Sequence, residues 1–141
     1  ARDTVVGLSA SGGAGYVLAA IAEAKRRGAA TVGITCVPRS PLARAAGVSL
    51  SPRVGPEVIA GSTRLKAGTA QKMLLNMLST CVMSRLGRVE GNVMTHLKPL
   101  NAKLRDRAAR IASRALGIPR EEARRRLERR GWNLTQVLGN R

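Results

Sequence analysis

The chain has 141 residues, 44% of them apolar, with one Trp, one Tyr and no Phe, so we expect one folded domain with an aliphatic core. The formal net charge is +17, from 25 Lys and Arg against 8 Asp and Glu, which favours an anionic partner or substrate. One His and two Cys without CxxC spacing leave no zinc ligand set, and the apolar runs are too short to cross a bilayer. We therefore predict a cytoplasmic protein without a metal or a cofactor, in which Cys36 and Cys81 are buried thiols.

The first third of the sequence predicts a βαβ unit. Residues 4–8, TVVGL, form a short apolar run rich in β-branched residues, which is typical of a fully buried strand. Apolar residues recur at helical spacing over residues 16–27, and residues 30–36, ATVGITC, form a second buried strand. A short helix over 42–46 and a third strand over 47–51 extend a parallel sheet with right-handed connections.

Helices are predicted for most of the remaining chain. A long helical pattern runs from Ser62 to Leu86, and one broad apolar face is expected to pack across the sheet, formed by Met73, Leu74, Met77, Leu78, Cys81 and Val82. An irregular connection over 91–100 contains His96, which we expect in a surface or packing position. Three shorter helices then form a small bundle, over residues 101–116, 120–130 and 131–138. The expected core of this bundle is Leu127, Trp132, Leu134 and Leu138.

A serine- and glycine-rich loop, SASGGAG over residues 9–15, follows the first predicted strand. Ligands of open parallel sheets bind beyond the carboxyl ends of strands, which is where this loop lies. Its glycines let the backbone approach an anion, and the hydroxyls of Ser9 and Ser11 can donate to phosphate oxygens. The loop is neither a Walker loop nor a dinucleotide fingerprint, so a plain turn is the alternative interpretation.

A second stretch, GPEVIAGSTRLKAGTAQK over residues 55–72, combines a turn, one carboxylate, two hydroxyls and three cations. It predicts a loop followed by a helix that begins near Ser62, with Ser62 and Thr63 as capping residues. The N-terminus of such a helix suits a phosphate or carboxylate ligand. A capped surface helix with solvated cations is the alternative.

Together these two loops resemble the sugar isomerase domain and, more closely, the family of N-acetylmuramic acid 6-phosphate etherases and the related glucokinase regulatory protein. The resemblance covers about residues 4–92 and is most specific at GPEVIAGSTRLKAGTAQK and at LLNMLST, residues 74–80. It implies an α/β fold, a three-layer αβα parallel sheet of sugar isomerase type that is present in part. The C-terminal part of that domain is predicted over residues 1–97, and a helical C-terminal extension over 98–141.

The resemblance implies phosphosugar binding and, in the etherases, cleavage of the lactyl ether by removal of the C2 proton and later addition of water. Glu57 is the single candidate for a catalytic base, and a structural or sugar-contacting role is the alternative for it. The family's usual catalytic glutamates lie in an N-terminal half that this sequence does not contain, so the sequence leaves open whether the chain is an enzyme by itself. The implied binding residues are Ser9, Ser11, Gly12, Gly13, Glu57, Ser62, Thr63 and Lys66.

Three hypotheses for the function follow. The first is the phosphosugar-binding C-terminal half of an etherase, working as a homodimer or with a companion N-terminal half. The second is a non-catalytic module that senses a sugar phosphate. The third is a basic nucleic-acid binder, which the scarcity of aromatic residues for base stacking disfavours. Because the chain starts at Ala1 and enters a predicted strand after three residues, we expect a fragment or one piece of a larger subunit.

Overall fold

The computed structural model describes residues 3–96 and 98–139, and the chain divides into two compact units between Leu78 and Ser79. Helix α3 (Lys66–Arg85) runs across this division. The domain boundary predicted from the sequence falls at Leu97, which lies outside the described residues, so that boundary stays a prediction.

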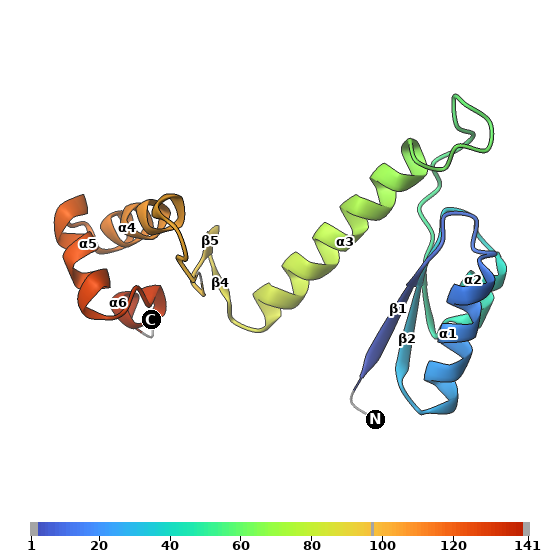
Figure 1. Cartoon of the computed structure of the whole chain (residues 1–141), viewed down its shortest axis with the longest axis horizontal. Helices are drawn as coiled ribbons and strands as arrows, with labels where there is room; N and C mark the ends of the chain where they lie inside the picture. The colour runs from blue at the N-terminus through green and yellow to red at the C-terminus, as the bar shows by residue number, and fades with distance from the viewer. Residues whose placement is uncertain (1–2, 97, 140–141) are drawn as a thin grey trace. The chain divides into compact units, whose positions relative to one another are not determined.

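The first unit is built on a parallel sheet of three strands in the order β1-β2-β3. The strands are β1 (Thr4–Leu8), β2 (Ala30–Ile34) and β3 (Val48–Leu50). Helices α1 (Gly15–Arg26) and α2 (Pro41–Ala45) connect consecutive strands and pack against the sheet (Figure 1). In the register, Val6 pairs with Val32, and Val32 pairs with Val48. The predicted α/β class with a parallel sheet is confirmed.

The prediction that the first strand is fully buried is wrong. Only Gly7 of β1 is buried, while Val5 and Val6 are half-buried and Leu8 is exposed. The reason is that β1 and β3 are the two edges of a three-stranded sheet, so only β2 has a neighbouring strand on each side. Correspondingly, β2 carries three buried residues, including Ile34.

The predictions for the long helix also need correction. Helix α3 begins at Lys66, four residues later than the predicted start at Ser62. Its apolar face was expected to pack across the sheet, yet Ala67 is the one residue of α3 that is buried. Met73 and Met77 are 58% and 60% exposed, and Cys81 is an exposed thiol rather than a core residue. These side chains have no covering layer among the described residues.

After the end of α3, the second unit contains a short hairpin that overlaps the irregular connection predicted over residues 91–100. Strands β4 (Val89–Glu90) and β5 (Val93–Met94) pair antiparallel. The two-residue turn between them contains Gly91, whose φ of 57° is the left-handed conformation that such turns need. Strands of two residues carry too little periodicity to be recognised from the sequence alone.

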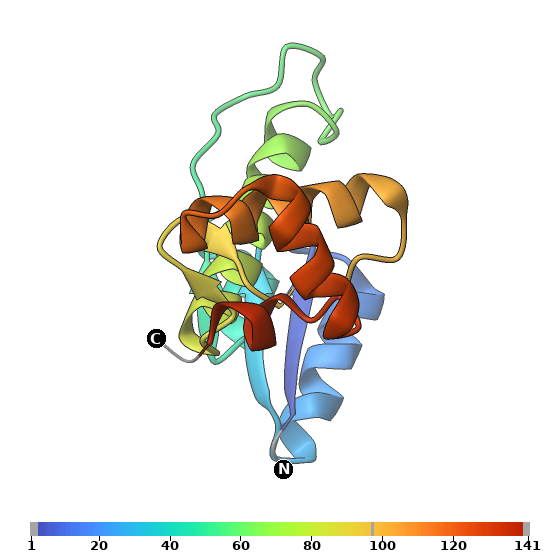
Figure 2. The same ribbon diagram turned by 90° about the vertical axis from the view of Figure 1, so that its left-hand side faces the viewer.

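Three helices follow and form the predicted bundle (Figure 2). They are α4 (Ala102–Leu116), α5 (Arg120–Arg129) and α6 (Leu134–Leu138). Asn101 caps α4 by accepting a hydrogen bond from Leu104 N at 2.9 Å, and Gly117 ends α4 with a φ of 64°. The buried core consists of Ala108, Ala109, Ala112, Ala123, Leu127 and Leu134. Leu127 and Leu134 are confirmed as core residues, whereas Trp132 and Leu138 pack against the core and are only half-buried.

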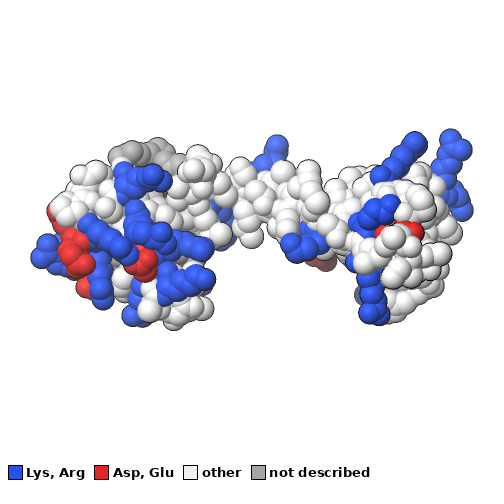
Figure 3. Space-filling model, turned by 90° about the horizontal axis from the view of Figure 1, so that it is seen from above, with Lys and Arg blue, Asp and Glu red and all other residues white. Residues whose placement is uncertain are grey.

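The surface of the second unit mixes many cations with fewer carboxylates (Figure 3). Several of these charges form ion pairs along or between helices, such as Arg110 with Asp106 at 3.2 Å and Arg124 with Glu128 at 3.1 Å. Across the described residues, no three His, Cys, Asp or Glu side chains gather as a metal site. No helix within residues 3–96 and 98–139 has the length and apolarity needed to cross a membrane.

The bundle core predicts a large effect for Leu127→Ala. Leu127 is fully buried between α4, α5 and α6, so its truncation should lower the free energy of unfolding of the second unit by about 2–5 kcal/mol. Chemical denaturation followed by helical circular dichroism measures this change. Leu100→Ala is the matched control, because Leu100 is 85% exposed and its loss should change the free energy of unfolding little. Equal effects of the two substitutions would contradict this core.

Candidate functional site

The loop of residues 9–13 follows β1 at the carboxyl edge of the sheet and is held by its own hydrogen bonds. Gly12 N donates to Ser9 O at 3.0 Å and to Ser9 Oγ at 3.1 Å, and Gly13 N donates to Ser11 Oγ at 3.4 Å. Gly12 is buried, whereas Ser11 and Gly13 are exposed. The predicted loop residues therefore lie together, with the hydroxyl of Ser11 at the surface.

Gly12 lies against the segment that follows β2. Its φ is 71°, and a Cβ at this position would lie 2.5 Å from Ser40 Cβ and 2.8 Å from Thr35 Oγ1. Real side chains do not make contacts this close, so glycine is required both by the backbone conformation and by the space. Gly12 O also accepts a hydrogen bond from Leu42 N at 2.9 Å. The loop is therefore fixed in place.

Thr35 and Ser40 are the buried polar residues that fix this loop. Thr35 Oγ1 donates to Ala10 O at 3.3 Å and receives a hydrogen bond from Ser40 Oγ at 3.3 Å. Ser40 Oγ also accepts from Ala43 N, which caps α2. Neither residue was among those predicted for the site from the sequence. The Ser40-Pro41 pair, a cap followed by proline at the first helical position, was the signal that could have located Ser40.

The N-terminus of α1 follows the loop and has no capping side chain. The residue at the cap position is Ala14, and the first backbone hydrogen bond of the helix runs from Leu18 N to Ala14 O at 3.0 Å. The amides of Gly15, Tyr16 and Val17 therefore have no acceptor within the helix. Gly15 has open space around it, and Tyr16 is 87% exposed. This exposed helix end can accept an anion beside the Ser11 hydroxyl.

The N-terminus of α3 is different, because a carboxylate of the chain already occupies it. Glu57 Oε2 accepts from Lys66 N at 3.0 Å, and Glu57 Oε1 accepts from Ala67 N at 2.9 Å. The cap is therefore Glu57, nine residues before the helix, and not Ser62 as predicted. A carboxylate forms stronger hydrogen bonds with two amides than one hydroxyl can, which explains why the helix begins at Lys66.

These two hydrogen bonds set the charge state of Glu57. The amides of Ala67 and Lys66 hold the pKa of this carboxyl below its ordinary value of 4.5, and the Lys66 ammonium acts in the same direction. A carboxylate with a lowered pKa is a weaker base, which does not favour proton abstraction. The geometry describes Glu57 as an anchor of α3, and its predicted catalytic or sugar-binding role stays a prediction.

Residues 34–36 at the end of β2 bring the two predicted loops to one edge of the sheet. Ile34 O accepts from Ser9 N at 3.0 Å and from Gln71 Nε2 of α3 at 3.4 Å. Cys36 N donates to Ala10 O, while Cys36 Sγ lies 3.8 Å from Ala67 O. Burial, and then the Glu57 carboxylate, raise the pKa of the Cys36 thiol, so it stays protonated as a donor. The loop after β1 and the start of α3 are thus neighbours.

Ser62 and Thr63 lie in the turn before α3, and Lys66 is the first residue of the helix. Ser62 N donates to Ile59 O, and Thr63 O accepts from Gly68 N, both at 3.0 Å. Thr63 and Lys66 are exposed. Among the described residues, the hydrogen bonds of Ser62 and Thr63 stay within their own segment, so their assignment to the site stays a prediction.

Comparison with known proteins identifies the family to which this fold and these loops belong. The family model described as SIS domain matches residues 1–81. An N-acetylmuramic acid 6-phosphate etherase of Symbiobacterium thermophilum is 53% identical over 136 residues, which are 96% of this chain and 45% of that protein. The etherase of Rubrobacter xylanophilus is 55% identical over 130 residues, covering 92% and 43%. That of Salmonella paratyphi B is 51% identical over 137 residues, covering 97% and 46%. The chain thus spans about half the length of these curated relatives.

The contact of Gly12 with Thr35 and Ser40 predicts that Gly12→Ala destabilises the first unit by about 1–3 kcal/mol or more, since it adds both backbone strain and overlap. Gly13→Ala is the matched control one residue away. Its added Cβ would meet nothing closer than Ser11 Oγ at 3.9 Å. Thermal unfolding of both variants measures the difference. An equally stable Gly12→Ala variant would show that the loop does not pack in this way.

The capping role of Glu57 predicts a pH-dependent effect of Glu57→Gln. The folded pKa of Glu57 is lowered, so its stabilising contribution is present above pH 4.5 and is lost as the pH falls through the lowered folded pKa. At neutral pH the variant should therefore melt at a lower temperature than the parent chain, and this difference should shrink as the pH falls below 4.5 toward the lowered folded pKa. Melting curves over this pH range measure it. The control is Asp3→Asn, which removes an exposed carboxylate of the first unit outside any helix, and a pH-independent difference for Glu57→Gln would contradict the capping role.

Proposed function

The chain belongs to the SIS domain family, and from this membership and the geometry of the loops we propose that it forms the phosphosugar-binding part of an N-acetylmuramic acid 6-phosphate etherase. The proposed ligand is the 6-phosphate of an N-acetylated amino sugar that carries a lactyl ether. The proposed role of the whole enzyme is a lyase reaction in the recycling of cell-wall amino sugars in the cytoplasm.

One observation carries the proposal for binding. The N-terminus of α1 leaves three backbone amides without an acceptor within the helix, next to an exposed serine and at the carboxyl edge of a parallel sheet. A phosphate dianion is a suitable acceptor for such amides, because the helix end also carries partial positive charge. In the proposal, Ser11 donates to the phosphate, whereas Ser9 keeps Gly12 in place.

The chemistry of the proposed reaction requires more than this chain supplies. Elimination needs a base that takes the C2 proton of the sugar and an acid that protonates the departing lactate oxygen, after which water adds to the resulting double bond. Glu57 is held as an anchor by two backbone amides with a lowered pKa. We therefore assign the base and the acid to residues outside this chain's two loops.

Because the two loops supply neither the base nor the acid, the proposal includes a second polypeptide segment. The curated etherases are about twice as long as this chain, and α3 exposes Met73, Met77 and Val82 on more than one side of the helix. A helix that is apolar on several sides is normally surrounded by other elements. We propose that a companion N-terminal half covers α3 and contributes the acid and the base, in an assembly that is dimeric at the level of whole subunits.

The proposal predicts binding without turnover for the 141-residue chain alone. Calorimetric titration with N-acetylmuramic acid 6-phosphate should show saturable binding, and lactate release should appear only after a companion N-terminal half is supplied. Ser11→Ala should weaken binding by roughly 10- to 100-fold, the effect of one hydrogen bond to a charged group of about 1.5–3 kcal/mol.

The control is Ser84→Ala, which removes an exposed hydroxyl of α3 far along the chain from the loop and should leave binding unchanged. Absence of binding both alone and with the companion half would overturn the proposed function. Lactate release by the chain alone would overturn the assignment of the acid and the base to another segment.

A further inference from the structure

A hollow of about 620 Å³ in the second unit has three cations in its lining. It opens between the end of the β4–β5 hairpin, the connection before α4, and the turn between α5 and α6. Arg88, Lys98 and Arg105 line it, and no Asp or Glu is among the described residues of the lining. The volume is in the range of small-molecule sites.

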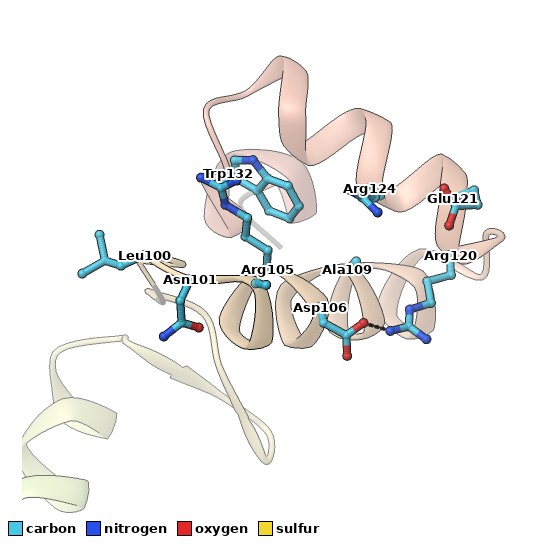
Figure 4. A pocket seen from close by; sticks show the side chains of 10 residues that line it. Leu100, Asn101, Arg105, Asp106, Ala109, Arg120, Glu121, Arg124 and Trp132 are labelled. Carbon is cyan, nitrogen blue, oxygen red and sulfur yellow. Dashed lines mark ion pairs between the residues drawn. The ribbon is translucent and has the colours of Figure 1, made fainter.

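The neighbouring hollow differs from this one in how its cations are paired. That hollow also has about 620 Å³ and shares Arg105 and Trp132 with the first, but its other cations have carboxylate partners. Arg120 pairs with Asp106, as Figure 4 shows, and Arg124 pairs with Glu128 at 3.1 Å. The described residues provide no such ion pair for Lys98 or Arg105. The two hollows therefore differ in electrostatic character.

The indole of Trp132 forms the wall shared by both hollows. The Arg105 guanidinium lies over the indole, 5.3 Å from the ring centroid (Figure 4). Trp132 also has a φ of 62°, an uncommon value for a bulky side chain, and Trp132 N donates to Leu127 O at 2.7 Å. The hydrogen bond holds the Trp132 backbone in place, and the indole lies beside the Arg105 guanidinium in the lining of the hollow.

Polar side chains complete the lining beside the cations. Thr95 and His96 belong to the chain that leaves the hairpin, and Thr135 Oγ1 of α6 donates to Thr95 O at 3.3 Å, which joins the two walls. His96 Nδ1 lies 3.1 Å from Thr95 Oγ1. The lining therefore combines cations with groups that hydrogen-bond with hydroxyls.

We propose that this hollow is a second anion site, which binds a small phosphomonoester such as a sugar phosphate. Several cations around one hollow suit a phosphate, with nearly two negative charges and three acceptor oxygens at neutral pH, better than a carboxylate with one charge. The volume left beyond the phosphate accommodates a polar body of sugar size. A single indole does not provide the row of stacking surfaces that nucleic acid strands use. The site lies in the second unit and is separate from the loop after β1, so it goes beyond the proposed function.

The single tryptophan makes this site directly observable, because Trp132 is the one Trp of the chain. Titration of the 141-residue chain with glucose 6-phosphate should change the Trp132 fluorescence saturably, and glucose should not. Lys98→Gln, which leaves the Arg105–Trp132 stack intact, should weaken this binding by about tenfold, and the double variant with Arg105→Gln should weaken it further. Inorganic phosphate should compete with glucose 6-phosphate.

The matched control removes the same charges elsewhere in the unit, as Lys103→Gln with Arg125→Gln, since both residues are exposed and neither lines the hollow. Ser9→Ala with Ser11→Ala tests the loop of the first unit and should leave the Trp132 response unchanged, so failure of one site is distinguishable from failure of the other. The proposal is overturned if glucose 6-phosphate produces no saturable response, or if the control weakens binding as much as Lys98→Gln. A response to an oligonucleotide or to polyglutamate at far lower concentration than to glucose 6-phosphate would also overturn it.

Discussion

The close approach of Gly12 to Thr35 and Ser40 is the constraint on which the carboxyl edge of the sheet depends. It joins the loop after β1 to the segment after β2 through a buried pair of hydroxyls. The Ser40 hydroxyl has two roles, because it donates to Thr35 Oγ1 and also caps α2. A shift of one element would therefore disturb the next. This buried contact therefore positions the exposed Ser11 hydroxyl and the start of α1.

Besides α2, which Ser40 caps, the longer helices α1 and α3 begin at this edge, and their first amides have different partners. The first amides of α3 are satisfied internally by Glu57, whereas those of α1 have only Ala14 at the cap position. An incoming anion would compete with a carboxylate at α3 but with no side chain at α1. The proposed phosphate is therefore expected at α1, even though the sequence has more cations and hydroxyls near α3.

The sequence predicted what depends on local pattern and missed what depends on contacts distant along the chain. The three parallel strands, the short helix between the second and third strands, and the bundle core at Leu127 and Leu134 follow from local sequence pattern. The start of α3 was misplaced because its cap, Glu57, lies nine residues away and the near hydroxyl of Ser62 offered a plausible local alternative. Thr35 was missed because its role exists only when a second loop reaches it. The exposure of Cys81 could not be predicted, because an apolar helix face indicates that a partner covers it but not whether that partner belongs to the same chain.

In the second unit, some cations have carboxylate partners and others do not, which the net charge alone does not reveal. Arginines on the outer faces of α4 and α5 are accompanied by Asp106, Glu122 and Glu128, and the resulting exposed pairs contribute little to stability. These pairs neutralise part of the positive charge on those faces. Lys98 and Arg105 lie around a hollow without a carboxylate in its described lining. The cations around this hollow repel one another, which destabilises the folded unit. An anion bound in the hollow would reduce this repulsion, so binding of the proposed phosphomonoester should stabilise the bundle.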